Sequence, residues 1–261
     1  MTIDEDIIMN QPTDHLIYEY TIRNTETDVD DRLQLHTLFS MLQEAAALNA
    51  EVYGWGAEQL DPVNLSWLLL RVSVRMEKMP SWRDKIGVET WSRGSDRLYF
   101  FRDFIIRDAD QNILGYASSV WIVVDKTHHR PIRPTQLTQM AKTLSDPARV
   151  FPEDPPKLAP VSDLLSKESQ LIKFADFSEI DRNHHVNNTR YVAWCLDAYH
   201  KDSSLHDIVT GIDINYFSEI KFGSKVHLYC SVSDGKTQID GLVESSEKPA
   251  FSAVLYTSTK E

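Results

Sequence analysis

Two series of alternating hydrophobic and polar residues run along the chain, and each contains one stretch with the periodicity of a helix. In the first series, residues 37–52 place four apolar side chains on one helix face: Leu38, Leu42, Ala45 and Ala46. In the second series, apolar residues recur at helical spacing after Asn187: Tyr191, Val192, Trp194 and Cys195. The pattern therefore predicts one long helix in each half of the chain.

Alternation with a period of two residues predicts the β-strands of both series. The first series has five strand-like segments: 16–23, 68–78, 85–91, 98–107 and 113–124. The second series has another five: 170–174, 212–217, 225–232, 238–243 and 250–256. Turn residues at 108–110 and at Asp234-Gly235 fall at hairpin positions. The order of one strand, one helix and four strands occurs twice, and internal duplication is its most economical explanation.

A proline-rich segment separates the two series. Seven of the eleven prolines lie between Pro131 and Pro160, which predicts an irregular linker with a short helix around residues 135–144. We therefore divide the chain into an N-terminal domain at 1–145, a linker at 146–165 and a C-terminal domain at 166–261. One long helix on an antiparallel sheet, occurring twice, predicts an α+β fold of two tandem hotdog domains, in which a curved sheet wraps a helix. Two unrelated α+β domains are the alternative.

Aligning the halves by hand adds detail to the predicted duplication. Residues 82–86 match residues 222–226, and a gapless match of Asp31-Arg32 to Asp181-Arg182 sets Leu33 and Leu35 opposite Asn183 and His185. On this match the polar residues occur only in the second half, and the first half is free to supply an apolar pocket. Pairing of the copies would join their sheets and bring the start of one helix next to the other half, which forms a cleft.

Composition indicates an ordinary globular protein. The chain has 261 residues, of which 42% are hydrophobic and 25% charged. A net charge of −12 argues against general affinity for nucleic acid, because phosphate binding needs clustered cations. No segment reads as a targeting peptide or a membrane span, so we expect a soluble, cytoplasmic protein. Two cysteines without a Cys-x-x-Cys pair make cysteine-based zinc or redox chemistry unexpected, and we expect no metal and no cofactor.

The candidate chemistry lies just before the second helix, where Asp181, Asn183 and His185 occur at i, i+2 and i+4. The first turn of a helix has unpaired backbone N–H groups that suit a developing oxyanion, so acid/base groups and an oxyanion site would lie together. The alternative is that Asp181 and Asn183 only cap the helix, which both residue types favour.

Dispersed motifs in the same order resemble the acyl-[acyl carrier protein] thioesterases, double-hotdog enzymes that end fatty acid synthesis. In the second half they are Asp181-x-Asn183-x-His185-Val186-Asn187-Asn188-x-x-Tyr191-x-x-Trp194 and Tyr216-Phe217-Ser218-Glu219. In the first half they are Thr37-Leu38 with Leu42-Gln43-Glu44, Trp67-x-x-x-Arg71, Pro80-Ser81-Trp82 and Ala117-Ser118-Ser119-Val120-Trp121. The resemblance implies catalytic roles for Asp181, Asn183, His185 and Glu219, and a substrate carried by acyl carrier protein. Ile220 stands where plant members often have a cysteine, so a cysteine mechanism at that position is not available.

Glu219 or His185 would act as general base on a water that attacks the thioester, with Asp181 orienting its neighbours and Asn183 positioning the water or the carbonyl. The sequence has no nucleophile elbow, phosphate-binding glycine loop or dinucleotide motif. The basic run at 128–133, with Arg190 and Lys221, is a candidate surface for the acidic carrier protein.

Three other functions stay open at this point. They are a hotdog acyl-CoA thioesterase, a hotdog hydratase or dehydratase, whose Asp-x-Asn-x-x-His is one residue longer, and a non-catalytic module that binds acyl groups or carrier protein. Three tryptophans are expected to pack in the core or between the halves rather than to contact substrate: Trp67, Trp82 and Trp121. Acyl chain length does not follow from the sequence, and both a monomer and a homodimer are compatible with it.

Overall fold

The computed structural model describes residues 15–128, 130–133, 137, 145–204 and 206–258. Three α-helices lie in these ranges: α1 (Leu35–Val52), α2 (Ala57–Leu60) and α3 (Asn188–His200). The strands of the first half are β1 (Leu16–Thr21), β2 (Leu65–Met76), β3 (Lys85–Asp96), β4 (Tyr99–Asp108), β5 (Ile113–Asp125) and β6 (Arg130–Ile132). Those of the second are β7 (Leu171–Phe174), β8 (Ile208–Tyr216), β9 (Lys225–Ser233), β10 (Lys236–Val243) and β11 (Phe251–Ser258). Both long helices and all ten strands expected from the sequence are confirmed.

All these strands belong to one antiparallel sheet with the order β1-β3-β4-β5-β2-β8-β11-β10-β9-β7, and β6 pairs with β5. Read outward from the centre, the order of the second half repeats that of the first, with β8, β11, β10, β9 and β7 in the places of β2, β5, β4, β3 and β1. The halves meet where β2 pairs with β8, from Arg71 opposite Asn215 to Arg75 opposite Gly211. The α+β prediction and the joining of the two sheets are therefore confirmed.

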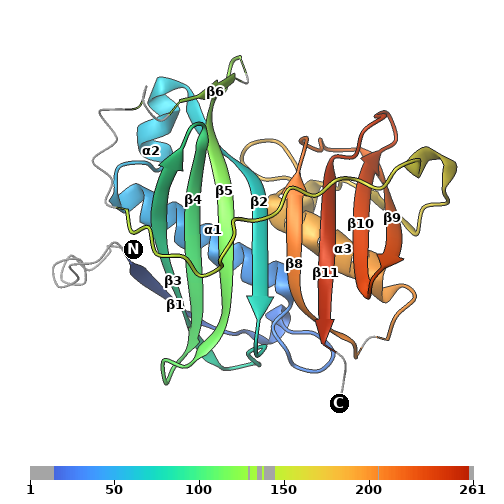
Figure 1. The fold of residues 1–261 in the computed structure, drawn as a ribbon, viewed down its shortest axis with the longest axis horizontal. Coiled ribbons are helices and arrows are strands. Elements are labelled where there is room, and N and C mark those ends of the chain that lie inside the picture. Colours follow the sequence, from blue (N-terminus) through green and yellow to red (C-terminus); the bar gives the residue numbers. More distant parts are fainter. Residues whose placement is uncertain (1–14, 129, 134–136, 138–144, 205, 259–261) are drawn as a thin grey trace.

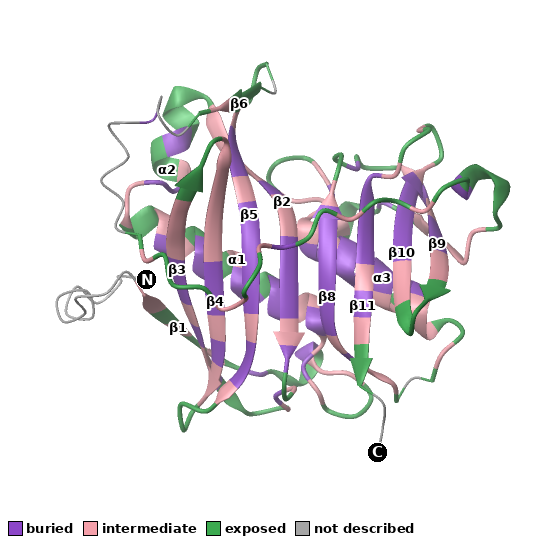
Figure 2. Cartoon of the chain, viewed as in Figure 1, coloured by how far each residue is buried: buried purple, intermediate pink, exposed green. Residues whose placement is uncertain are grey.

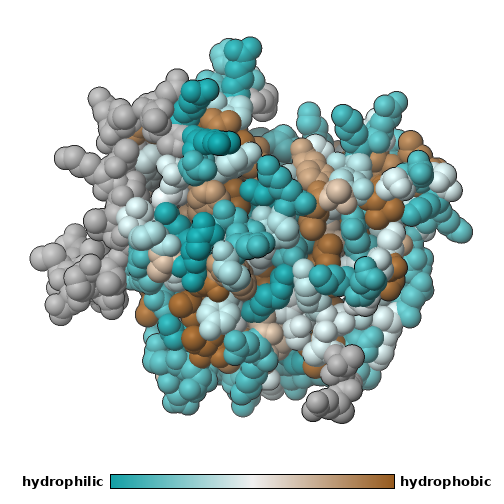
Figure 3. All heavy atoms as spheres, viewed as in Figure 1, coloured by the Kyte–Doolittle hydropathy of each residue, from teal (hydrophilic) through white to brown (hydrophobic). Residues whose placement is uncertain are grey.

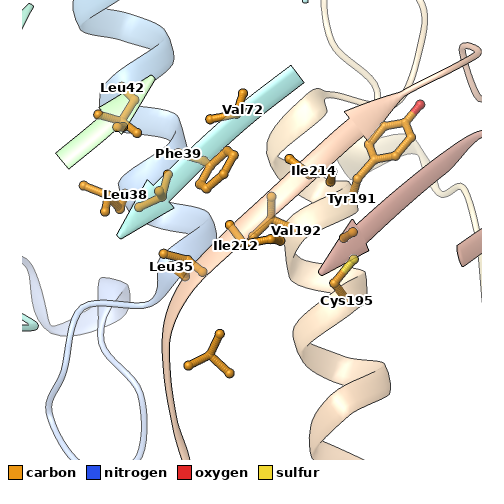
Figure 4. Close-up of a cluster of buried hydrophobic side chains, with 14 of the residues drawn as sticks. Leu35, Leu38, Phe39, Leu42, Val72, Tyr191, Val192, Cys195, Ile212 and Ile214 are labelled. Atoms are coloured by element: carbon orange, nitrogen blue, oxygen red, sulfur yellow. The ribbon is translucent and has the colours of Figure 1, made fainter. Parts of the chain in front are cut away.

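Both long helices lie on the same face of the sheet, α1 behind the first half and α3 behind the second (Figure 1). The four apolar positions predicted for each helix face are buried, from Leu38 in α1 to Cys195 in α3. Side chains of α1 and α3 converge on Val72 of β2 and on Ile212 and Ile214 of β8 (Figure 4). The most buried stretches of the sheet lie side by side on its central strands (Figure 2). None of the described helices is both long enough and apolar enough to cross a lipid bilayer.

The other face of the sheet carries the connection between the halves. Residues 145–163 form no helix or strand and cross this face, where hydrophilic and hydrophobic side chains are mixed (Figures 1 and 3). Two buried carboxylates hold the segment: Val150 N–H donates to Asp103 (2.9 Å) and Val161 N–H donates to Asp240 (3.2 Å). Burial raises the pKa of both aspartates. The short helix predicted around 135–144 lies outside the described residues, apart from Leu137.

Corresponding turns support the predicted duplication. Arg83 and Gly223, aligned by hand, both have left-handed backbone conformations, with φ of 73° and 77°, and β3 and β9 both begin two residues later. Asp234 and Gly235 form the predicted two-residue hairpin with positive φ at both positions.

The gapless match around Asp181 is wrong by three residues. Asp28 N–H donates to the carbonyl of Arg32 (2.8 Å) as Asp181 N–H donates to that of His185 (2.9 Å). Arg32 then bridges to Ser81 as His185 bridges to Lys221. The dipeptide Asp-Arg occurs by chance at both 31–32 and 181–182, and the hand alignment followed this identity instead of the loop geometry. The alignment therefore placed leucines opposite the polar residues. The structural counterparts of Asp181, Asn183 and His185 are polar too: Asp28, Asp30 and Arg32.

Candidate active site

The loop before α3 fixes the first three candidate residues. The Asp181 carboxylate accepts the backbone N–H of Asn183 (2.8 Å), and the Asp181 carbonyl accepts that of His184 (3.0 Å). His184 adopts a left-handed conformation, with φ of 64°, which turns the chain back so that His185 pairs with Asp181. Neither Asp181 nor Asn183 caps the helix. That role belongs to Asn187, whose side-chain oxygen accepts the N–H of Thr189 (3.0 Å), so the capping alternative is wrong.

The fourth candidate, Glu219, comes from the loop after β8 and meets the imidazole. Its Oε2 lies 3.0 Å from His185 Nε2. The protein covers more than half of the surface of each of these two side chains. Two hydrogen bonds align the loops: Val186 N–H donates to the backbone carbonyl of Ile220 (2.8 Å), and Ile220 N–H donates to the side-chain hydroxyl of Tyr191 (3.2 Å). The structure thus brings together two residues that are 34 positions apart in the sequence.

One cavity of about 1130 Å³ takes in all four candidates, Asp181, Asn183, His185 and Glu219. Neighbouring residues of the second half line it too, and the opposite wall comes from the first half, chiefly α1, the segment 53–70 and parts of β3, β4 and β5. An aromatic cluster covers part of this wall: Trp55, Trp67, Phe100 and Trp121. The predicted cleft between the halves is confirmed.

The packing predicted for the tryptophans is confirmed for Trp67 and Trp121 and wrong for Trp82. Trp67 and Trp121 pack against each other and also line the cavity, while Trp82 is 40% exposed with Arg83 stacked on its ring. Trp55 and Phe100 also line the cavity, although they were not among the residues predicted for the site. Their positions on the cavity depend on how β4 and the segment after α1 approach each other, which no local pattern encodes.

The cavity reaches the first turn of α3 at Asn188. The N–H of Thr189 is taken by the Asn187 side chain and that of Arg190 by the Asn187 carbonyl (2.9 Å). None of the hydrogen bonds found within the described ranges uses the N–H of Asn188. The first turn of α3 therefore keeps one backbone donor, the N–H of Asn188, without a partner among the described residues.

Charged residues join the two halves at the rim of the cavity. Arg182 Nη2 lies 3.1 Å from Asp61 Oδ2, and Asp61 also pairs with Lys126. All three side chains line the cavity. These ion pairs are largely exposed, so they add little to the stability of the protein and mainly orient the loop that carries Arg182.

Comparison with known proteins agrees with this architecture. The family model for the acyl-ACP thioesterase N-terminal domain matches residues 14–137, and that for the C-terminal domain matches residues 166–252. A palmitoyl-acyl carrier protein thioesterase of Gossypium hirsutum is 27% identical over 252 residues, covering 91% of this chain and 60% of the relative. An oleoyl-acyl carrier protein thioesterase of Coriandrum sativum is 26% identical over 217 residues, covering 77% and 58%. The chain thus spans less than two thirds of the length of these relatives.

Solved structures share the fold. An acyl-ACP thioesterase of Bacteroides thetaiotaomicron superposes with a TM-score of 0.83 at 23% identity, over 94% of this chain and 98% of that one. A 12:0-ACP thioesterase of Umbellularia californica gives a TM-score of 0.83 at 22% identity, over 97% and 100%. With both domain models matched in order along the same double fold, this chain belongs to the acyl-ACP thioesterase family.

Proposed function

We propose that the protein hydrolyses the thioester of acyl-[acyl carrier protein] and releases a free fatty acid, which ends fatty acid synthesis. The observation that carries the proposal is the contact of His185 with Glu219 on a large cavity shared with the first half. The family membership and the names of the plant relatives support the same reaction.

In the proposed reaction a water molecule attacks the thioester carbonyl carbon, the C–S bond breaks, and the thiol and the carboxylic acid leave. Glu219 accepts Nε2–H of His185, which leaves Nδ1 of the neutral ring as the site that takes the proton from water and returns it to the departing sulfur. A thioester is an activated acyl donor, so no covalent intermediate is needed. This assigns His185 as the base and Glu219 as the residue that orients it.

Asp181 and the helix start complete the proposed site. Asp181 holds the loop through the Asn183 N–H, which places the Asn183 side chain at the cavity to position the water or the carbonyl. The N–H of Asn188 would stabilise the oxyanion, and a donor of this kind typically contributes about 10²- to 10³-fold to the rate.

Acyl carrier protein is the proposed partner, with the basic residues Arg130 and Arg133 as part of its docking surface. Carrier proteins are acidic, so exposed cations near the cavity speed the encounter. His129 of the predicted basic run lies outside the described residues. We further propose the division into domains at 1–145 and 166–261 with a linker at 146–165, which the two domain matches support, and a cytoplasmic location.

The test is fatty acid release from matched acyl-carrier-protein and acyl-CoA thioesters of medium to long chain, compared by kcat/KM. We expect a strong preference for the carrier protein, and a higher KM for those substrates alone when Arg130 and Arg133 are both changed to Glu. Preference for CoA would make the enzyme an acyl-CoA thioesterase. No release from either series would contradict hydrolysis and favour a hydratase or a binding module.

A further inference from the structure

Four phenylalanines are exposed in the described part of the chain, and all of them lie beside the loops of the candidate active site: Phe174, Phe177, Phe217 and Phe222. The first two precede the loop before α3, and the other two lie on either side of Glu219. The exposed fraction is 85% for Phe177 and 65% for Phe222. Single exposed apolar residues are common on protein surfaces, but several large ones gathered in one place indicate an interaction site.

Two backbone hydrogen bonds join the segments 174–177 and 222–224. Ala175 N–H donates to Ser224 O (2.9 Å), and Gly223 N–H donates to Ala175 O (2.8 Å). The exposed phenylalanines of these two segments therefore belong to one surface, which we call the phenylalanine patch: Phe174, Phe177 and Phe222.

The first half builds the same turn with other residues. Ile22 N–H donates to Asp84 O (2.9 Å), and Arg83 N–H donates to Ile22 O (2.9 Å). These two bonds repeat the hydrogen bonds of Ala175, and in this register the counterparts of the patch are Thr21, Asn24 and Trp82. The turn therefore does not require phenylalanine at 174 or 177, and the copy without the proposed catalytic residues has polar residues there.

The phenylalanine patch is close to the cavity. Phe217 lines the cavity, Phe222 comes three residues after Glu219, and Phe177 comes four residues before Asp181. With about 3.8 Å between successive Cα atoms, the Cα atoms of these two pairs are at most about 11 Å and about 15 Å apart. A second copy of the chain or a lipid surface seated here would have to uncover the cavity at each turnover. A partner that brings the thioester to the cavity fits this position better.

A cation without an acidic partner lies next to the patch. Lys221 immediately precedes Phe222, is exposed, and forms no ion pair within the described ranges. By contrast, Lys173 and Lys225 each pair with a carboxylate at 2.6 Å. Apolar surface beside an unpaired cation suits a partner that has apolar contact residues with acidic residues next to them.

We propose that the phenylalanine patch and Lys221 form a docking surface for the acyl carrier protein on the second half of the chain. The inference rests on the proposed function for the identity of the partner. Arg130 of β6 flanks the cavity from the first half, because β6 pairs with β5 next to Val124 and Lys126, which line the cavity. A partner that spans the cavity contacts both sides, and a specific interface typically covers about 800 Å² on each protein.

The test measures docking without hydrolysis. Acyl carrier protein that carries its acyl group through an amide is titrated into the protein, and calorimetry gives the Kd. We expect the double variant Phe177→Ser with Phe222→Ser to raise this Kd at least about tenfold, because a few aromatic residues supply most of the binding energy of an interface. With the carrier-protein thioester the same variant should raise KM and leave kcat unchanged. With an acyl-pantetheine thioester, which has no protein to dock, kcat/KM should be unchanged.

Two further variants assign the effect to the patch. Trp82→Ser is the matched control, since Trp82 is an exposed aromatic residue at the corresponding turn of the first half, and its Kd should equal that of the wild type. Phe177→Ser alone keeps the test valid if the change at Phe222 disturbs the loop of Glu219, and it should raise the Kd about threefold. An unchanged Kd in both patch variants, or an equal rise in Trp82→Ser, would overturn the inference.

Two other occupants of the patch have their own outcomes. Flotation with phosphatidylcholine vesicles detects binding to a lipid surface, and sedimentation detects a second copy of the chain. If the double variant loses vesicle binding or a dimer while its Kd for the carrier protein is unchanged, the docking surface for the carrier protein is overturned.

Failure of the proposed reaction and failure of the docking surface give different results. If the wild-type protein hydrolyses no thioester but the double variant weakens binding of the amide-linked carrier protein, the reaction fails and the docking surface stands. If the thioester is hydrolysed and the double variant changes neither Kd nor KM, the reaction stands and the docking surface fails.

Discussion

Glu219 reaches His185 because two neighbouring residues tie their loops together. Val186 and Ile220 are both buried and share a backbone hydrogen bond, and the Tyr191 hydroxyl accepts the next N–H along the second loop. Burial raises the pKa of Tyr191 well above its usual value, so its hydroxyl stays protonated and neutral. The proposed catalytic pair, His185 and Glu219, is therefore held in place by groups that stay neutral.

Replacing Asp181 or Glu219 by Ala is expected to lower kcat by about 10²- to 10⁴-fold, because each change disrupts the orientation of the proposed base. Steady-state hydrolysis of an acyl-carrier-protein thioester measures the loss, and thermal unfolding shows that the fold is kept. Glu244→Ala is the control, since Glu244 is an exposed carboxylate that also contacts a histidine but lies away from the cavity. Near-normal rates in both site variants would contradict the proposed mechanism.

The spacing of Asp181, Asn183 and His185 identified this loop from the sequence, because the residues are close along the chain. Glu219 came from the family resemblance alone, since its contact with His185 exists only after β8 has paired with β2 and β11. Trp55 and Phe100 had no sequence signal as cavity residues, because a single aromatic residue is equally compatible with the core until the elements around it are placed.

Among the elements, β10 and β11 show how closely the second half is packed. Gly241 on β10 pairs with Phe251 on β11, and both are buried. A Cβ added at Gly241 would lie 1.9 Å from the Phe251 ring, which cannot move without displacing Tyr191 packed against it. Glycine is required here by space rather than by backbone conformation.

We expect Gly241→Ala to lower the free energy of unfolding by about 1–3 kcal/mol, the usual cost of overpacking a core. Urea denaturation measures it. Gly87→Ala on β3 is the matched control, because the added Cβ would meet only the Ile17 side chain, at 3.1 Å, and Ile17 is 46% exposed and free to move. If both variants lose the same free energy of unfolding, the loss would come from replacing a flexible glycine in a strand. The contact with Phe251 would then not explain it.

Most elements were predictable because each long helix and strand repeats its pattern over several turns or residue pairs. The elements missed, α2 and β6, have four and three residues, too few to show any period. The alignment error around Asp28 has a related cause, since a five-residue loop carries little periodic information and is defined by hydrogen bonds between its ends.

At the scale of the whole molecule, the pairing of β2 with β8 makes the two halves one sheet. A buried carboxylate strengthens this pairing, because Asp213 of β8 accepts hydrogen bonds from Ser73 (2.6 Å) and Arg75 (2.9 Å) of β2 and from Tyr256 (2.7 Å) of β11. Burial and the neighbouring Asp213 raise the pKa of Tyr256 to about 12, which keeps its hydroxyl as a donor. The linker adds a second connection across the sheet.

The halves are therefore expected to unfold together, and the chain offers a natural reporter for each. Five of the six tryptophans lie in the first half: Trp55, Trp67, Trp82, Trp91 and Trp121. Both cysteines lie in the second, and burial suppresses thiolate formation by raising the pKa of Cys195 and that of Cys230, the latter to about 11. Tryptophan fluorescence and thiol labelling during urea titration should give the same midpoint. Two separate midpoints would show that the shared sheet does not couple the halves.

Joining the two copies within one chain also changes how the sheet meets its surroundings. Within the described ranges, the sheet ends at β1 and β7, which have only six and four residues, while the long strands β2 and β8 are paired on both sides. Short terminal strands offer few free backbone groups to another chain, so they are poor templates for intermolecular strand addition. The duplication thus protects the protein against edge-to-edge aggregation, since the long central strands β2 and β8 shield one another.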